Sequence, residues 1–563
     1  MKYLNKKTII SACLFFGINN TIAFMAPTPG DFEQQTQLEE ARRREEEQRR
    51  QIDAPGVKLQ EEQKISKKVE LPVEEVSFQV ERIIVESTMP SKFSFAQRLV
   101  EQYENRKIGI QGINLLAQML SENIMARGYV TTSVTIPEQD LTSGTLRFTI
   151  IPGKISNIRF EDPSMYGTWR NAFPTRAGKI LNIRSLEQGL EQMKRVPNQD
   201  VTMELLPGQS QGESEVLIKV ARTKPWTIGF SFDDSGMKDT GRLQSSANIS
   251  IYNPTGLNDI ISYSYGKDAE GNDSKFGTRN FNISYSIPFG NYTFSFLRYR
   301  YRYLQTISGY NDFESKSRTD AVELNLQKVI YRDQTKKTQA YFKLTKKERR
   351  NYLEDVEIEV QRQQTTSYQI GFMHRQYMGR NILDASVYFQ KGVPWWGAQP
   401  GYGDNIPDMG TTRYSLWGLN LNIMVPLKLG PVDARYSFTF RGQYTKDILY
   451  SSDHFSIGGR WTVRGFNGEY TLSAENGYII RNELAFPLKK MNMEFFLGAD
   501  MGRVWGPSDF YLTGKNLAGT VFGVRGTLLK HMQYEGFIGT PIYKPEGFKA
   551  GKTALGFSLY LQF

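Results

Sequence analysis

The feature that most constrains this chain is the alternation of apolar and polar residues through residues 224–563. In the last segment one face carries Leu555, Phe557, Leu559, Leu561 and Phe563. Gly556, Ser558 and Gln562 fall on the other face. A period of two is typical of β-strands with one apolar face. A soluble sheet of this size would need a partner layer, which nothing in the segment could provide. A closed barrel with lipid outside and water inside satisfies every strand.

The length of residues 224–563 bounds the number of strands. A membrane strand takes about 9–11 residues plus its turn, so the segment holds roughly 14 to 18 strands. We expect an even number, because the preceding domains and the end at Phe563 both belong on the periplasmic side. The sequence therefore predicts an all-β transmembrane barrel of about 16 antiparallel strands. Such a barrel encloses an aqueous channel that admits an extended chain or a hairpin but not a folded domain.

Composition agrees with this interpretation and excludes others. The chain has 30 Tyr, 34 Phe and 49 Gly, which rise together in β-rich chains with many tight turns. A mean hydropathy of −0.47 rules out a bundle of membrane helices. The formal net charge is +11, and Lys2, Lys6 and Lys7 supply three of those charges. The remainder is modest for 563 residues and does not indicate nucleic-acid binding.

One predicted strand departs from simple alternation. Within residues 292–303 the aromatic residues occupy even positions at first and odd positions from Tyr299 onward. Arg298, Arg300 and Arg302 then lie opposite the tyrosines. Two interpretations are open: a β-bulge near Leu297 restores the register, or the strand leaves the bilayer at this point.

The first residues have the features of an export signal. Residues 1–23 combine a lysine-rich start, an apolar stretch and small residues before a cleavage point, as in a secretory signal peptide. Cys13 is the only cysteine and lies within it. The mature chain is therefore expected to have no disulfide framework, thiol nucleophile or thiolate metal site.

Residues 31–53 predict a charged helix without an apolar stripe. Four acid–base pairs have i,i+4 spacing with the acid first, namely Glu39–Arg43, Glu40–Arg44, Glu45–Arg49 and Glu46–Arg50. Each such pair stabilises a helix by roughly 0.2–0.5 kcal/mol. The helix is either a solvated tether or a polar rod that fits a water-filled pore. Residues 54–73 are expected to form a flexible linker.

Two small αβ modules are predicted between the linker and the barrel, over residues 74–153 and 154–223. Each combines strands of alternating pattern with helical packing faces on a small sheet. A sheet of this kind keeps an open edge, which can pair with an incoming extended peptide.

The sequence gives no support to enzymatic chemistry. Residues 208–212 match the G-x-S-x-G nucleophile pattern, but strands flank them on both sides, so Ser210 is predicted to lie in a hairpin turn. The three histidines, His374, His454 and His531, are not spaced like metal ligands or a catalytic triad. A phosphate-binding G-x-x-x-x-G-K-[ST] loop is also absent. We expect neither an enzyme nor a cofactor.

The loop motif Val463-Arg464-Gly465-Phe466 resembles the V-R-G-F/Y motif of the Omp85 superfamily. The segment Phe495–Gly502 resembles the conserved strand that follows it, with Asp500 at the acidic position. The two modules resemble POTRA domains. Together with the charged helix and the segment that ends at Phe563, this order is similar to the TpsB transporters of two-partner secretion.

The resemblance implies a bacterial outer-membrane pore with its POTRA domains in the periplasm. Such a pore recognises an unfolded TpsA-type exoprotein (a haemolysin, adhesin or contact-dependent growth-inhibition toxin) and exports it without ATP once the helix has left the barrel. It further implies a monomer that contacts outer-membrane lipid and binds no nucleic acid. Phe563 would engage the barrel-assembly machinery during biogenesis. The main alternative is an Omp85-type assembly factor, which usually carries more POTRA modules and lacks the charged helix; an enzyme barrel and a plain porin are further alternatives.

In this family the motif-bearing loop folds back into the barrel, and alternation points Asp500 into the lumen. We therefore expect Arg464 to pair with Asp500 and to anchor the loop to the wall. The alternative is that Arg464 is a solvated loop residue.

Overall fold

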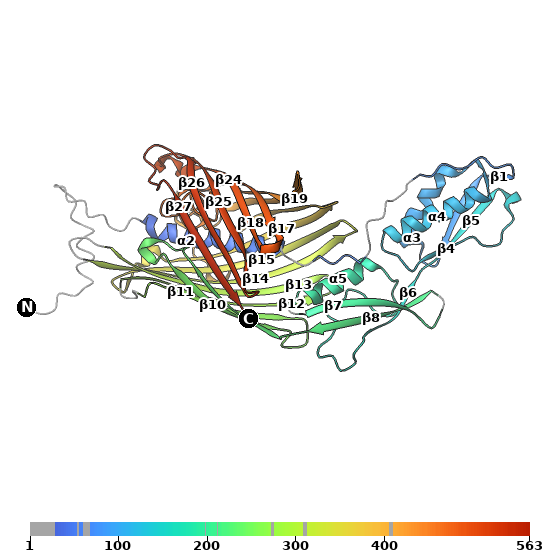
Figure 1. The fold of residues 1–563 in the computed structure, drawn as a ribbon, viewed down its shortest axis with the longest axis horizontal. Coiled ribbons are helices and arrows are strands. Elements are labelled where there is room, and N and C mark those ends of the chain that lie inside the picture. The colour runs from blue at the N-terminus through green and yellow to red at the C-terminus, as the bar shows by residue number, and fades with distance from the viewer. Residues whose placement is uncertain are drawn as a thin grey trace, which may run out of the picture.

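The computed structural model of this chain describes residues 29–52, 56–59, 68–197, 199–210, 212–271, 275–307, 312–404 and 409–563. The predicted signal peptide, residues 1–23, lies outside them, and only part of the predicted linker lies within them. A large barrel dominates the molecule. The helix α2 (Pro29–Ile52) runs within it, and two αβ modules project from one end (Figure 1).

The barrel is closed, and every described strand pairing in it is antiparallel. The prediction of about 16 antiparallel strands is confirmed. Sixteen long strands are found within the described residues, and the two-residue β16 (Val356–Glu357) extends the hairpin between β15 and β17. The long strands are β9 (Trp226–Asp233), β10 (Gln244–Tyr252), β11 (Ile260–Asp268), β12 (Phe276–Phe289), β13 (Tyr292–Ile307), β14 (Phe313–Arg332), β15 (Lys336–Leu353), β17 (Gln363–Met378), β18 (Asn381–Val393), β19 (Ser415–Leu429), β20 (Val432–Thr445), β23 (Asn476–Leu488), β24 (Met493–Trp505), β25 (Asn516–Leu528), β26 (Met532–Tyr543) and β27 (Ala554–Gln562).

The barrel closes where its last strand meets its first. Strand β27 pairs with β9 over five residue pairs, from Ser558 opposite Asp233 to Gln562 opposite Gly229. Phe563 continues this seam, because its backbone N–H donates to the carbonyl of Ile228 at 2.9 Å. This seam is much shorter than the pairing of β13 with β14, which runs from Tyr292 to Ile307.

The predicted bulge near Leu297 is wrong. Strand β13 stays in unbroken register with β12 and with β14 through this point. Its odd residues face the lumen, where Tyr299 and Tyr303 are buried, and its even residues face outward. At about 3.3 Å per residue the strand is far longer than an apolar band of about 25 Å needs, even when tilted. The change of pattern therefore marks the end of the lipid-facing part, as the second interpretation held.

The two αβ modules each have their own hydrophobic core. The first contains helices α3 (Pro90–Val100) and α4 (Ile110–Ala126), and its strands are β1 (Ser77–Val80), β2 (Arg82–Ser87), β3 (Arg106–Gly109), β4 (Ser133–Thr135) and β5 (Thr145–Ile151). The second contains helix α5 (Ile183–Lys194), and its strands are β6 (Lys154–Phe160), β7 (Gln199–Pro207) and β8 (Glu213–Arg222). Helix α3 begins at Pro90, whose fixed backbone angle favours the first turn of a helix, and a 3₁₀ turn, Glu101–Tyr103, follows it.

The G-x-S-x-G segment lies in a hairpin turn, as predicted. It connects β7 to β8, which pair antiparallel. The backbone N–H of Gly208 donates to the carbonyl of Glu213 at 2.9 Å, and the N–H of Glu213 donates to the carbonyl of Ser210 at 3.1 Å. Among the described residues no helix is both long and apolar enough to cross a membrane.

Candidate functional site

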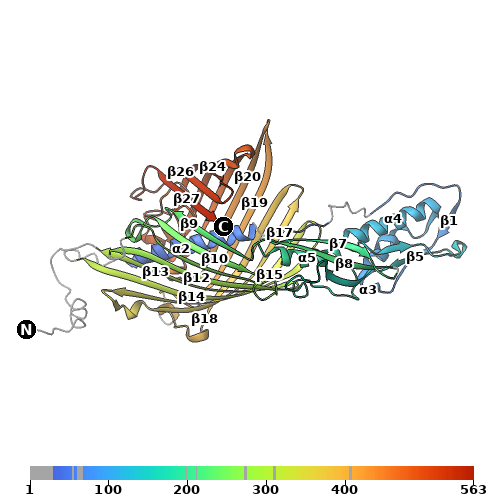
Figure 2. The same cartoon turned by 60° about the horizontal axis from the view of Figure 1, so that its bottom comes forward.

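The lumen of the barrel holds helix α2, which contacts walls on opposite sides of the channel (Figures 1 and 2). A helix with so little apolar surface is stable there only because its polar side chains find partners on the wall. Gln35, Thr36, Gln37 and Glu45 are all buried. Of the two interpretations of residues 31–53, the structure therefore agrees with the polar rod in the pore. The helix spans Pro29–Ile52.

One side of the helix is held by strands β13 to β15. The Arg43 guanidinium lies 2.6 Å from the carboxylate of Glu323 and stacks over the ring of Tyr299 at 3.8 Å. Glu40 accepts a hydrogen bond of 2.8 Å from Lys347. These contacts combine charge with cation–π attraction in a wall that is otherwise polar.

The other side is held by strands β20 and β23. The Glu45 carboxylate lies 3.0 Å from Arg441 and 3.3 Å from Arg481. Arg441 also donates to the side-chain oxygen of Gln48 at 2.7 Å. Glu45 thus supplies the negative charge for two wall arginines at once, and it is the central electrostatic contact on this side.

The predicted i,i+4 pairs do not explain the helix. Glu46–Arg50 lies outside the described side chains, and of the three pairs within them only Glu45–Arg49 lies within ion-pair distance, at 3.3 Å. Arg43 instead reaches Glu323, and Glu40 reaches Lys347. Other pairs do form along the helix, since Glu46 lies 3.0 Å from Arg42 and Glu40 lies 3.7 Å from Arg43. The charges of α2 therefore serve both the helix and the wall.

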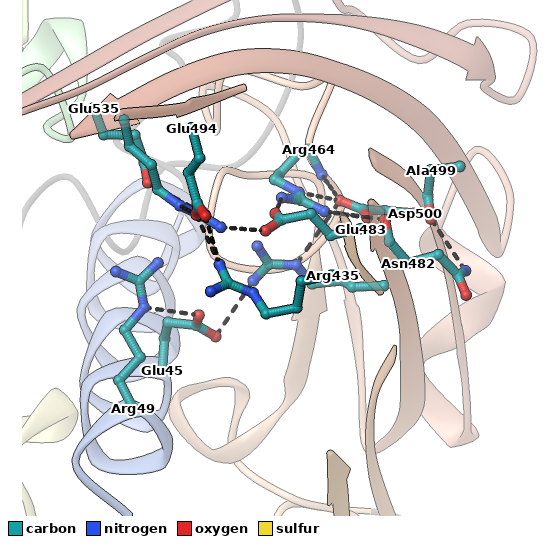
Figure 3. Close-up of polar contacts among 12 residues, drawn as sticks. Glu45, Arg49, Arg435, Arg464, Asn482, Glu483, Glu494, Ala499, Asp500 and Glu535 are labelled. Carbon is teal, nitrogen blue, oxygen red and sulfur yellow. Dashed lines mark hydrogen bonds and ion pairs between the residues drawn. The ribbon is translucent and has the colours of Figure 1, made fainter. Parts of the chain in front are cut away.

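The motif-bearing loop folds into the barrel between β21 (Phe455–Ile457) and β22 (Leu472–Ala474). Figure 3 shows Arg464 directed at Asp500 on strand β24. The Nε and Nη2 atoms of Arg464 donate to the two Asp500 oxygens at 2.7 and 2.9 Å, and its backbone N–H adds a third bond of 2.9 Å. The Arg464 and Asp500 side chains are 6% and 0% exposed, so this is a buried, two-pronged ion pair. The structure thus brings Arg464 and Asp500 together, and Arg464 is not a solvated loop residue.

The rest of the motif packs the loop against the wall. Val463 and Phe466 are buried in one apolar cluster, and the Phe466 ring meets Phe548 edge-on at 5.8 Å between centroids. Gly465 has φ +112°, and a Cβ there would lie 2.7 Å from the carbonyl oxygen of Thr540. Only glycine adopts this conformation so close to a strand without strain. Each motif position therefore has a separate physical reason for its residue type.

The ion pair belongs to a larger network that the sequence prediction did not include. Glu483 accepts a bond of 2.5 Å from Arg464 and is also bound by Arg525 at 2.7 Å. Arg481 connects the two parts of the site, since it lies 3.9 Å from Asp500 and 3.3 Å from Glu45. The loop and the plug helix thus meet the same wall charges. Arg481 and Glu483 alternate with apolar residues along β23, which is the sequence signal that they face the lumen.

The second αβ module docks on the barrel at the periplasmic end of the channel. Arg195 donates to the hydroxyl of Ser286 at 2.6 Å, and Gln192 donates to the carbonyl of Gly290 at 3.0 Å. Arg332 lies 2.8 Å from the carboxylate of Glu191. A cavity of about 360 Å³ lies between α5, the end of α2 and the wall, and its lining includes Glu47, Gln192, Arg332 and Asn422. This vestibule lies between the module and the channel.

Two buried carboxylates of α5 face Arg332 at this joint, Glu191 at 2.8 Å and Glu187 at 3.5 Å. Burial alone would raise the pKa of Glu191, but the positive charges of Lys337 and Arg332 outweigh that effect, so the pKa of Glu191 lies below its usual range. Lys337 also hydrogen bonds to this carboxylate. The joint therefore favours the charged form of Glu191.

His454 contacts a buried carboxylate next to strand β23. His454 lies 3.5 Å from Glu475, and burial would raise the pKa of Glu475. Hydrogen bonds from His454 and Ser508 outweigh burial and lower that pKa to about 2. Among the described residues no group of three or more histidine, cysteine, aspartate or glutamate side chains could hold a metal ion.

A closed membrane barrel with a helix in its lumen and two αβ modules below it defines an outer-membrane protein transporter. The sequence profile of the haemolysin secretion/activation protein family ShlB/FhaC/HecB matches residues 212–526. Profiles of the ShlB-type POTRA domain and of the POTRA domain match residues 78–153 and 154–207. The chain belongs to the ShlB/FhaC/HecB family, the TpsB transporters of two-partner secretion. It is a transporter of TpsA partners rather than an enzyme.

Relatives and solved structures agree along nearly the whole chain. The outer membrane transporter CdiB-2 of Burkholderia pseudomallei is 38% identical over 96% of this chain and 97% of the relative. The haemolysin transporter protein ShlB of Serratia marcescens is 30% identical over 74% of this chain and 73% of the relative. The structure of CdiB from Escherichia coli has a TM-score of 0.86 at 26% identity, covering 96% of this chain and all of that one. These matches favour the transporter over the assembly factor.

Proposed function

We propose that this outer-membrane transporter exports one large exoprotein of the contact-dependent growth-inhibition type. Its similarity to CdiB-2 is higher and covers more of the chain than its similarity to the haemolysin transporter ShlB. The observation that carries the mechanism is the helix α2, which occupies the channel and is held there by ion pairs with the wall. Water that enters the channel can replace such polar contacts as the helix moves, so the plug can leave and return.

Capture of the unfolded partner begins at the POTRA domains. The sheet of the second POTRA domain has the order β6-β8-β7, which leaves β7 at its edge. The other edge is partly covered, because Ile155 bonds to the segment 178–181. Thr202 and Glu204 on β7 are exposed. An extended segment of the partner pairs with this open edge by strand addition.

Passage through the barrel follows release of the plug. The partner segment enters through the vestibule beside α5, and α2 gives up its contacts with both walls. A nucleotide is not required. The partner folds outside the cell, and the apolar surface buried there makes return of the chain unfavourable.

The Arg464–Asp500 pair acts as the loop-to-barrel anchor in this proposal. The loop around this pair is shaped by the motif residues Val463, Gly465 and Phe466. Arg481 connects the anchor to the plug, because it lies close to both Asp500 and Glu45. Phe563 at the barrel seam is the position that the barrel-assembly machinery engages during biogenesis. The transporter works as a monomer in outer-membrane lipid and binds no nucleic acid.

Export and capture are tested in one set of strains. A photo-crosslinking residue at position 204 is expected to capture the partner's N-terminal region during secretion, whereas the same residue at Arg159 on β6 is the matched control. Secretion of a growth-inhibition exoprotein and of a haemolysin is measured by their appearance on the cell surface. We expect the first to be secreted and the second not. Equal crosslinking from both positions contradicts capture at β7. Secretion of the haemolysin alone contradicts the proposed partner.

A further inference from the structure

The outer surface of strands β11 to β15 carries a row of positive charges that export does not use. Its members lie directly opposite one another on adjacent strands: Lys267 opposite Arg279, Arg279 opposite Arg302, Arg302 opposite Arg318, and Arg318 opposite Arg350. We call these five residues the cationic row. Like charges placed opposite one another destabilise a sheet, so such a row needs a counter-charge.

The cationic row faces away from the lumen. The neighbouring residue Tyr303 faces the channel, where its hydroxyl lies 3.3 Å from that of Thr36 on α2. Residues adjacent along a strand point to opposite faces. Arg302 therefore points outward, and its directly opposed neighbours Arg279 and Arg318 share that face.

The cationic row lies just beyond the lipid-facing surface at the extracellular end. On β13 the outward residues change from Tyr292, Phe294 and Phe296 to Arg298, Arg300 and Arg302. The aromatic end adjoins the turn at Gly290 on which the POTRA domain docks, so the arginines lie at the opposite, extracellular end. This is the depth at which lipid headgroups meet the barrel.

The acids on this surface neutralise only part of the charge. Asp320 accepts from both Arg300 and Arg318 at 2.5 Å, and Glu348 lies 2.5 Å from Arg350. Arg298 and Arg302 have no acidic partner within the described parts of the chain, and both are exposed. A hollow of about 350 Å³ opens beside the row, lined by Arg279, Arg302, Lys316 and Arg318 together with apolar Leu304. The carboxylate of Asp355 also lines it and pairs with Lys316 at 2.7 Å, which leaves the three arginines to face an anion.

We propose that the cationic row binds the phosphate groups of a phosphorylated glycolipid in the outer leaflet of the outer membrane. Guanidinium groups bind phosphate in two-pronged geometry, and several converge here at one level. The apolar surface directly below them accommodates the acyl chains of the same molecule. A soluble anion would match the charge but would make no use of that adjoining apolar surface.

The test uses the purified full-length transporter in detergent and native mass spectrometry. Binding of bisphosphorylated lipid A is compared with binding of its dephosphorylated form. The double variant Arg298→Gln/Arg302→Gln removes Arg302 from the cationic row together with Arg298, an outward arginine beside the row on β13. Neither forms an ion pair within the described parts of the chain, so the variant leaves no carboxylate unpaired. Arg503→Gln is the matched control, because Arg503 is an exposed outward arginine at the same end of β24, away from the row.

The wild type and Arg503→Gln are expected to bind the bisphosphorylated lipid about tenfold or more tightly than the dephosphorylated lipid. The double variant should lose most of that preference while keeping the heat-dependent gel shift of a folded barrel. Unchanged preference in the double variant overturns the proposal. Full displacement of the lipid by millimolar inorganic phosphate overturns the lipid assignment. Crosslinking of the row to the exported partner instead of lipid also counts against it.

Discussion

Arg481 lies 3.3 Å from Glu45, so one arginine of the barrel wall directly holds the plug helix. The same guanidinium lies 3.9 Å from Asp500, the partner of the loop motif. The helix in the channel and the partner of the loop motif therefore share the charge of one wall arginine. A movement of the helix changes the field at the loop anchor, which gives a physical route from plug release to loop movement.

Glu45→Gln is expected to weaken the plug. The change keeps the shape of the side chain but removes the charge that faces Arg441 and Arg481. Hydrogen bonds to charged groups contribute about 1.5–3 kcal/mol, and lumen water reduces this to about 1–2 kcal/mol. The open fraction in planar-bilayer recordings should rise about tenfold.

The matched control for the plug is Glu47→Gln. Glu47 is also a helix carboxylate, but its side chain is 55% exposed and lies 3.8 Å from Lys343. Its conductance should stay near that of the wild type. If both variants open the channel equally, general loss of negative charge explains the effect and the specific role of Glu45 fails.

Arg464→Lys is expected to abolish most secretion although it keeps the positive charge. A lysine ammonium cannot reproduce the planar contacts with both oxygens of Asp500 and with Glu483. The double exchange Arg464→Asp with Asp500→Arg should rescue only weakly, because it puts a carboxylate beside Glu483 and a guanidinium beside Arg481. The secretion of both variants is compared with that of the control Arg503→Lys. Normal secretion by Arg464→Lys would remove the two-pronged pair from the mechanism.

Gly519→Ala is expected to displace the motif loop without touching any charge. A Cβ on Gly519 would lie 2.1 Å from the carbonyl oxygen of Arg464, which is backbone and cannot turn aside. Gly536→Ala is the control, because a Cβ there meets nothing within 4 Å. Only the first variant should lower secretion and the melting temperature of the barrel. Equal effects of the two changes would show that strand glycines matter for flexibility rather than for loop approach.

Periodicity predicted the barrel because every strand repeats the same alternation of apolar and polar residues. The approximate number of strands followed from the length of residues 224–563. Periodicity also placed Asp500 in the lumen. The partners of the plug were not predictable from spacing along α2, because Glu323, Lys347 and Arg441 come from strands far away in the sequence. Local spacing therefore predicted pairs along the helix, whereas the fold offered those charges partners with better geometry. The bulge near Leu297 failed for a related reason, since it assumed that all of β13 lies in lipid.

Acid is expected to release the second POTRA domain from the barrel. Docking lowers the pKa of Glu191 below its ordinary value of 4.5, so the docked state binds fewer protons than the undocked state. This contribution to docking is complete above about pH 4.5 and is lost as the pH falls through the lower, docked pKa. Spin labels at Asp200→Cys and Lys489→Cys report the distance, and Cys13 is the only native cysteine. Glu191→Gln should show the longer, undocked distance already at pH 7, whereas Glu204→Gln, an exposed change in the same domain, should not. A distance in Glu191→Gln that still matches the wild type at pH 7 would mean that the hydrogen bonds of Gln192 and Arg195, together with the contact between Glu187 and Arg332, are sufficient to hold the joint.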